Sequence, residues 1–472
     1  MLTEIFLFVR DNSAFCSTSS TSDHGPVYAG NLALLCVTAV CPRWRLVATN
    51  FSILWNNIAF STLKISSIQC AELFLGRTKG CILRIYISAP ALLDTPVILI
   101  QVHRLLFKIS SESHRVRVLD LLATPRTSVL YAYWANPRTN QRWIPRIDDV
   151  TASSCGAFPL VESMRLSSPS WYPVAPCLKN LDLRSNGNGG SLSSLLHALG
   201  GCPALEILTL QGFRRFIDED SFQAPATTLS KLHRLHIFFC NSAPILAFLQ
   251  LPSLTHPLVI FDSDPREGLL RCLPQGRPGV PYLEGVSKLN VVLNMRNSQY
   301  SVAAYREDGR MKLYLGVSMV SHQFRWQWIR GSMEAVASSD PLSETTAMSI
   351  TTDVIFTPWS PWLSKMRRLS RLDLCCPDIM GYLGTLSTSV GGSPLCPTLR
   401  TLALRRFQRS DELDYACLKA CILFRREAGC PLTSVLVPGD EWTRVRARDA
   451  SWSALVDSQG GLPLSVRPEY SN

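Results

Sequence analysis

The sequence predicts a mixed α/β fold, with a small helical unit at residues 1–60 and a long α/β body at residues 61–472. Three observations predict this fold. The first 60 residues carry apolar side chains at helical spacing, and the residues that follow alternate between helical and strand periodicity. One leucine pattern also recurs at a step of 27 residues.

The N-terminal unit is predicted to contain two amphipathic helices. Residues 2–9 place apolar side chains at positions i, i+3, i+4 and i+7, and residues 31–47 repeat such a stripe. The polar stretch at residues 11–30 predicts an exposed loop between them. Pro42 has two interpretations: an interior proline, which costs about 3 kcal/mol, or position N1 of a helix that starts at Cys41.

The first part of the body alternates short helices and strands. Helical periodicity predicts helices over residues 66–77 and 97–109. Alternating apolar residues predict strands over residues 81–88 and 116–122.

The recurring pattern is Leu-x-x-Leu-x-Leu, which we call the leucine template. Its copies, some with Val, Met or Ile, occupy Val161/Met164/Leu166, Leu178/Leu181/Leu183, Leu205/Leu208/Leu210, Leu232/Leu235/Ile237, Leu369/Leu372/Leu374, Leu399/Leu402/Leu404 and Leu432/Val435/Val437. Steps of 20–29 residues are typical of leucine-rich repeats, in which each copy is a short strand with its leucines pointing inward. The pattern therefore predicts an irregular, horseshoe-like solenoid with helices such as residues 191–199 between strands, and a generic leucine-rich α/β core is the alternative.

The template is weak between residues 240 and 365. Strands are predicted at residues 286–291 and 311–317, and a surface loop near residues 332–352. This part of the body is therefore expected to consist of irregular units.

Composition excludes several classes of protein. No stretch approaches the roughly 18 uninterrupted apolar residues of a spanning helix, and the N-terminus lacks the features of a signal peptide. The 16 cysteines are scattered, as expected of buried thiols in a reducing compartment. We therefore expect an intracellular protein, cytoplasmic or nuclear, with no membrane partner.

Motifs that would indicate catalysis or cofactor binding are missing from the sequence. The segment Asn186–Ser191 is rich in glycine but no lysine follows it, and no Gly-x-Ser-x-Gly occurs. Cys375 and Cys376 are adjacent without a nearby histidine, which is not zinc-ligand spacing. We expect no enzyme activity, no cofactor and no metal, although a Ser/His/Asp triad from distant residues stays open.

The net charge of +11 is modest for 472 residues and permits, without requiring, an acidic or nucleic-acid partner. The segment 323–329 mixes arginine with tryptophan, which could stack bases, but a strand with exposed arginines explains it equally. We expect no nucleic-acid partner.

Several short motifs together resemble a known family. The block Cys41-Pro42-Arg43-Trp44-Arg45-Leu46-Val47-Ala48, followed by Leu54-Trp55, resembles the second half of an F-box-like domain. Residues 72–77, 113–117 and 418–436 resemble further elements of fungal F-box-like proteins with degenerate leucine-rich repeats.

The resemblance implies a substrate-recognition subunit of a Skp/cullin/F-box E3 ubiquitin ligase, whose helices dock on the Skp-type adaptor while the repeat body binds a protein substrate. The residues that would form or support the adaptor face are Ile5, Phe6, Val9, Val37, Val40 and Trp44. Two alternatives stay open: these residues only pack the helical core, or the chain is a repeat scaffold that binds a partner without ligase coupling.

One departure from the family bears on the adaptor face. F-box sequences normally carry a Leu-Pro pair and a glutamate just before the first helix, whereas this chain begins Met1-Leu2-Thr3-Glu4. Either the true start lies upstream or adaptor binding is weakened or lost.

Overall fold

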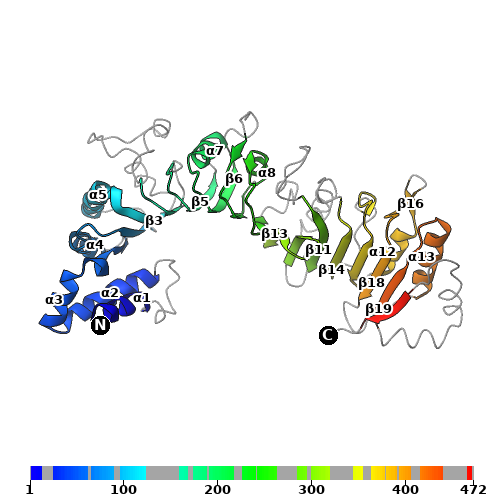
Figure 1. Ribbon diagram of the computed structural model, residues 1–472, viewed down its shortest axis with the longest axis horizontal. Coiled ribbons are helices and arrows are strands. Elements are labelled where there is room, and N and C mark those ends of the chain that lie inside the picture. Colours follow the sequence, from blue (N-terminus) through cyan, green and yellow to red (C-terminus); the bar gives the residue numbers. More distant parts are fainter. Residues whose placement is uncertain are drawn as a thin grey trace. The chain divides into compact units, whose positions relative to one another are not determined.

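The computed structural model describes most of the chain (Figure 1). The described residues are 2–12, 25–61, 65–89, 96–123, 159–167, 174–188, 191–216, 226–240, 242–262, 284–294, 299–318, 344–353, 363–377, 379–390, 393–405, 415–438 and 465–469. The chain forms two compact units. Unit 1 contains residues 1–234 and 248–253, and unit 2 contains residues 235–247 and 254–472. The division between these units differs from the expected boundary between residues 60 and 61. The separate helical domain at residues 1–60 stays a prediction.

Unit 1 begins with helices and continues as a parallel sheet. Its helical elements are α1 (Leu2–Asn12), α2 (Gly25–Ala39), α3 (Pro42–Asn50), η2 (Ser52–Trp55), α4 (Ile65–Arg77), α5 (Pro96–Ser111), η3 (Ser113–Arg115) and α7 (Leu192–Gly200). Its sheet has the order β1-β2-β3-β4-β5-β6, every neighbouring pair being parallel. These strands are β1 (Asn57–Ser61), β2 (Leu83–Ala89), β3 (Val116–Ala123), β4 (Ser163–Ser167), β5 (Asn180–Asn188) and β6 (Ile207–Arg215). A small parallel pair, β7 (Thr227–Thr228) and β9 (Leu249–Gln250), completes the unit.

Unit 2 has the strand order β8-β10-β13-β12-β11-β14-β15-β18-β19-β20. These strands are β8 (Arg234–Phe238), β10 (Leu258–Asp262), β11 (Val286–Asn294), β12 (Gln299–Arg306), β13 (Met311–Ser318), β14 (Ala347–Thr352), β15 (Arg371–Cys375), β18 (Thr401–Arg405), β19 (Ser434–Pro438) and β20 (Ser465–Glu469). The remaining elements are α8 (Ser242–Ala247), α12 (Ile379–Leu386), β16 (Ser389–Val390), β17 (Ser393–Pro394) and α13 (Tyr415–Glu427). β12 is antiparallel to both of its neighbours, whereas the other neighbouring strands in this order are parallel to one another.

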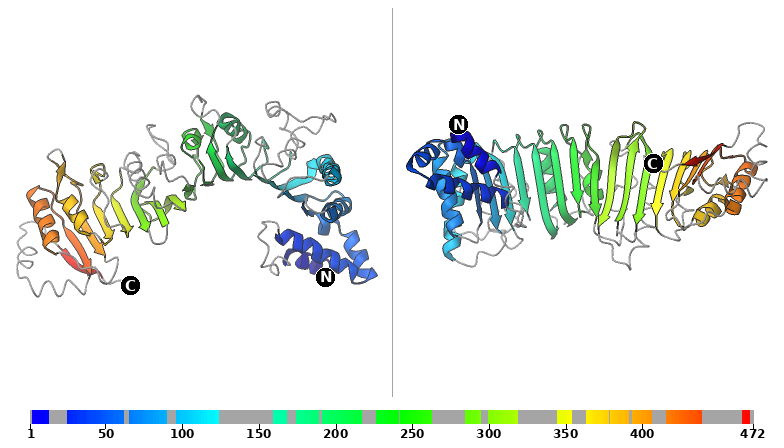
Figure 2. Two further views of the ribbon diagram at one scale, coloured as in Figure 1. Left: turned by 180° about the vertical axis from the view of Figure 1, so that it is seen from behind. Right: turned by 90° about the horizontal axis from the view of Figure 1, so that it is seen from below.

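The leucine template forms the core of both units. Equivalent positions of successive copies stand side by side, as Leu181 does with Leu208 and Leu372 with Leu402. Every residue of the seven copies is buried. Along these strands the buried template side chains face one side of the sheet, and the alternate positions, which are half-buried or exposed, face the other. We call this second side the open face. Figure 2 shows helices such as α7 and α13 beside the strands of the mixed α/β arrangement.

A short helix shows how the template face is covered. Ser191 begins α7, because its hydroxyl accepts a hydrogen bond from the backbone N–H of Ser194. Leu192, Leu195 and Leu199 lie on one stripe of the helix and are buried with the template leucines. The segment that resembled a phosphate loop therefore links a strand to a helix.

Most expected elements are present, and two N-terminal boundaries were wrong. The expected loop at residues 11–30 is shorter, because α1 continues to Asn12 and α2 begins at Gly25; residues 13–24 lie outside the described part. The expected single helix at residues 31–47 is two helices that meet at Cys41 and Pro42. Pro42 stands at the start of α3, so the N1 interpretation is confirmed.

The prediction of a surface loop near residues 332–352 was also wrong for the last part of that segment. Residues 347–352 form strand β14, with Met348 and Ile350 buried and Ser349 between them half-buried. The Ser/Thr-rich composition concealed a period-two pattern in which Ser349 and Thr351 lie on the open face. Residues 332–343 and the arginine–tryptophan segment 323–329 lie outside the described part.

Candidate functional site

The six expected adaptor residues differ in exposure. Phe6 is fully buried and its ring lies edge to face with Trp44, at 5.5 Å between centroids. Ile5 and Val40 are exposed, by 41% and 62%. Val9, Val37 and Trp44 are half-buried. Phe6 and Trp44 therefore join α1 to α3, and Ile5 and Val40 are the members available to a partner.

The N-terminal helices are fixed by side chains that bond to backbone carbonyls. Arg10, at the end of α1, donates through Nη1 to the carbonyl oxygen of Ile53 at 2.9 Å and to Oδ1 of Asn56 at 3.0 Å. Trp55 donates through Nε1 to the carbonyl oxygen of Ala48 at 2.8 Å. These bonds hold α1, α3 and η2 together, so the apolar residues on their outer surface have fixed positions.

That surface is unusually apolar. Seven of the thirteen exposed large hydrophobic residues in the described part of the chain lie between residues 5 and 53: Ile5, Phe8, Leu32, Val40, Leu46, Phe51 and Ile53. We call these seven residues the apolar helix surface. Exposed apolar residues concentrated in one region are typical of protein-binding surfaces.

Sequence reasoning missed most of this surface. Phe8 (67% exposed), Leu46 (63%) and Leu32 (60%) are more exposed than Ile5, but none lies in the expected set. The set was chosen mainly from the apolar stripe that packs the helices. Large apolar residues outside that stripe would have been the better signal for a binding surface, because they have no place in the helical core.

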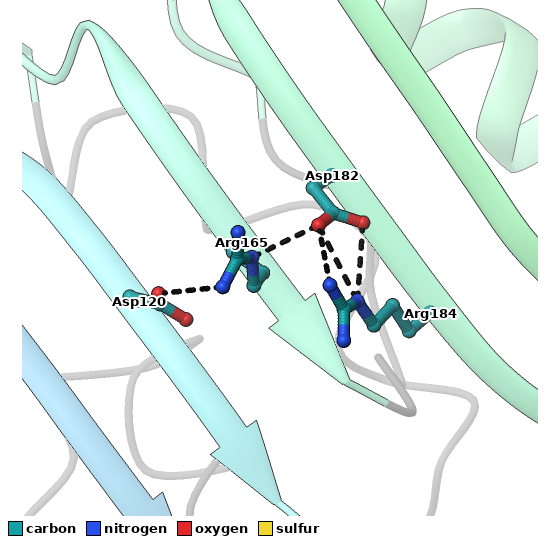
Figure 3. Close-up of polar contacts among 4 residues, drawn as sticks. All are labelled: Asp120, Arg165, Asp182 and Arg184. Carbon is teal, nitrogen blue, oxygen red and sulfur yellow. Dashed lines mark hydrogen bonds and ion pairs between the residues drawn. The ribbon is translucent and has the colours of Figure 1, made fainter. Parts of the chain in front are cut away.

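A second feature is a row of charged side chains on the open face of unit 1 (Figure 3). Asp120, Arg165 and Asp182 occupy directly paired positions of β3, β4 and β5. Arg165 binds Oδ2 of Asp182 through Nε at 2.9 Å and Oδ2 of Asp120 through Nη1 at 3.3 Å. Arg184 binds Oδ2 of Asp182 through Nη2 at 3.2 Å. We call these four residues the charged cluster.

The cluster has a clear electrostatic consequence. Both arginines are about one-third exposed, so their ion pairs add little stability. The carboxylates instead hold the guanidinium groups in fixed orientations. The arrangement suits binding of a polar partner to the open face more than it suits core packing.

Two arginines from the family-like motifs have packing contacts. Arg115 donates to the carbonyl oxygen of Cys81 at 2.7 Å and to Oγ1 of Thr78 at 2.9 Å. Arg425 is fully buried and donates to the carbonyl oxygens of Leu395 and Cys396, at 2.9 and 2.8 Å. Each fixes the turn before a strand, and we assign neither to a binding site.

The residues considered for catalysis or metal binding form no such site in the described part of the chain. No group of three or more His, Cys, Asp or Glu residues there could hold a metal ion. His236 lies on the open face of β8, with its ring edge to face with Phe238 at 5.9 Å. Within the described part, no helix is both long and apolar enough to cross a membrane.

Comparison with known proteins adds no further assignment. No protein-family model matches the chain, and no curated protein matches it.

Proposed function

We propose that the chain is the substrate-recognition subunit of a Skp/cullin/F-box E3 ubiquitin ligase. In this proposal residues 1–60 are an F-box-like helical domain that binds the Skp-type adaptor. The body is an irregular leucine-rich-repeat solenoid that binds a protein substrate. No catalytic group is required of the chain itself.

The apolar helix surface is the observation that carries the proposal. Its seven residues lie on or beside α1, α2, α3 and η2, in the region that carries the F-box-like sequence motif. Exposed apolar side chains on helices that are held in place are suited to bind a partner protein, because covering them lowers the free energy of the complex.

The regular placement of the template supports the second half of the proposal. Parallel strands whose equivalent leucines are paired in register are what repeat units produce when they stack. Stacking leaves the alternate positions on the open face, where they can differ from repeat to repeat and select a substrate.

The test is binding of the full chain to a purified Skp-type adaptor, measured by isothermal titration calorimetry. Ile5→Ser and Val40→Ser each remove an exposed apolar contact without touching the core, and we expect each to weaken binding about tenfold. Met380→Ser is the matched control, because Met380 on α12 is as exposed as Ile5 but lies in unit 2.

The outcomes separate the open alternatives. A folded chain that does not bind the adaptor would contradict ligase coupling and leave the scaffold interpretation. Binding that is equally strong in all three variants would show that the adaptor uses another surface, and would contradict the assignment of the apolar helix surface.

A further inference from the structure

Arg84 is a cation on the open face of unit 1 without a counter-charge among the residues that the structure describes. Arg84 lies on β2 and is exposed. Among the residues that the structure describes, its side chain forms no ion pair or hydrogen bond. It stands two residues before Tyr86 on the same strand, so both side chains face the same side of the sheet.

Arg84 lies on the strand next to the charged cluster, because Tyr86, two positions further along β2, is paired with a member of that cluster. Tyr86 on β2 is paired directly with Asp120 on β3, and Asp120 is bound by Arg165. Arg84, Arg165 and Arg184 thus lie on one face of β2, β4 and β5, with Asp120 and Asp182 between them.

The electrostatic balance around Tyr86 is positive. Burial raises the pKa of Tyr86; Arg84, Arg10 and Arg165 oppose this rise, and Asp120 reinforces it. Three guanidinium groups and one carboxylate therefore act on the same hydroxyl. Arg10 has its own neighbouring carboxylate, Asp11, at 2.8 Å.

We infer that the open face of strands β2–β5 binds an extended acidic segment of a protein partner. Arg84 supplies an exposed cation, Arg165 and Arg184 supply guanidinium groups oriented by their carboxylates, and Tyr86 adds a hydroxyl. The inference rests on the proposed function in that it names the chemical class of the substrate.

The dimensions and charges fit such a segment. Four neighbouring strands span about 14 Å, which an extended chain covers in about four or five residues. Carboxylates on alternate residues of that segment would point at the same face and could each meet a guanidinium group. A basic segment would instead be repelled by the exposed guanidinium group of Arg84.

The experiment measures fluorescence anisotropy of a labelled peptide of alternating Glu and Ser mixed with the full chain. A peptide of alternating Gln and Ser is the neutral control. We expect the acidic peptide to bind, the neutral peptide not to bind, and the affinity to fall as salt screens the charges.

Two variants with opposite expected signs locate the site. Arg84→Gln removes the exposed cation and should weaken binding about tenfold. Asp120→Asn removes an anion at nearly constant shape and should strengthen binding about two- to fivefold. A strengthened complex cannot result from misfolding, so the second variant remains informative if the first proves unstable.

Arg371→Gln is the matched control for charge. Arg371 on β15 in unit 2 is also an exposed strand arginine, but it is already paired with Asp373, at 2.9 Å. This variant should bind the peptide as the unchanged chain does. Equal weakening by Arg84→Gln and Arg371→Gln would show a response to net charge alone and would overturn the inference.

Other results would also overturn it: equal binding of the acidic and neutral peptides, or unchanged affinity in both Arg84→Gln and Asp120→Asn. These results are separate from the adaptor experiment. A chain that binds the adaptor but not the peptide loses only this inference, and one that binds the peptide but not the adaptor loses only the ligase proposal.

Discussion

Gly212 on β6 is the residue at which backbone conformation is most restricted by a neighbour. Its φ is +80°, and a Cβ atom added there would lie 1.9 Å from the carbonyl oxygen of Ser185. The pairing of β5 with β6 is irregular in the same place, beyond Arg184. Only glycine fits, because any other residue brings both a strained φ and an overlap with backbone.

We expect Gly212→Ala to lower the free energy of unfolding by more than about 2 kcal/mol. Gly309→Ala is the control, because Gly309 also has φ +80° but nothing lies within 4 Å of its added Cβ. Urea unfolding of both variants measures the difference. Equal losses of unfolding free energy in the two variants would mean that the positive φ alone accounts for the cost at Gly212. The overlap with the Ser185 carbonyl would then add nothing to it.

Residue identities predicted some local features and not others. Pro42 indicated where a helix starts, because proline lacks the N–H that an interior position needs. The pairing of Asp120 with Arg165, 45 positions apart, could not be predicted, because nothing local relates the two residues. Only the strand register brings them together.

Helix α3 begins with an unusual residue. Cys41 is its N-cap, and the Sγ atom accepts from the N–H of Trp44 at 3.5 Å. Sulfur is a weak acceptor, whereas serine is among the preferred N-cap residues. The start of α3 is therefore less stable than it could be, although α3 carries Trp44 and Leu46.

Cys41→Ser should raise the free energy of unfolding by about 0.5–1 kcal/mol, because the hydroxyl accepts a stronger hydrogen bond from the helix N-terminus. Thermal unfolding followed by circular dichroism measures the change. Cys41→Ala, which removes the acceptor, should shift the midpoint the other way. A serine variant no more stable than the alanine variant would contradict the capping role.

Elements with a clear apolar period were predicted, and elements without one were missed. The template copy Leu205/Leu208/Leu210 was expected to form a short strand, and its last two leucines lie in β6. β12 was missed, because its buried positions include Ser301, Ala303 and Ala304, small residues without a strand preference. These small residues are buried because β12 lies between β11 and β13 in the sheet, and their own side chains give no apolar signal in the sequence.

At the scale of the whole molecule, buried thiols link stability to pH. Burial raises the pKa of Cys396 to about 12 and also raises the pKa values of Cys202 and Cys421. Below pH 9 these thiols are neutral in both states. Above pH 9 the unfolded chain loses their protons while the folded chain keeps them, which favours unfolding.

The free energy of unfolding should therefore fall as pH rises above 9, with Cys396 contributing about 1.4 kcal/mol per pH unit up to its folded pKa. Cys396→Ala should reduce this slope, whatever it does to stability at pH 7. Cys36→Ala is the control, because Cys36 is exposed. Chemical denaturation at several pH values gives the slopes, and identical slopes in both variants would contradict this assignment.

The candidate surfaces were predictable only in part. The sequence motif directed attention to the N-terminal helices, but the selected residues include Phe6, which the structure buries, and omit Leu46, which it exposes. Helical spacing identifies a stripe without saying whether the stripe faces a core or a partner. The open-face cluster gave no signal, because its charges are distributed among three separate strands.

The reversed strand β12 also bears on the order in which unit 2 folds. Leu293 on β11 pairs with Tyr300 on β12, seven positions along the chain, whereas Met348 on β14 pairs with Leu372 on β15, 24 positions away. Short chain loops close at a smaller entropy cost than long ones, and local pairings form sooner. The β11–β12–β13 segment can thus assemble before its parallel neighbours and offer both of its edges as templates to β10 and β14. Pulse-labelled hydrogen exchange during refolding should find the amides of β11–β13 protected before those of β15 and β18.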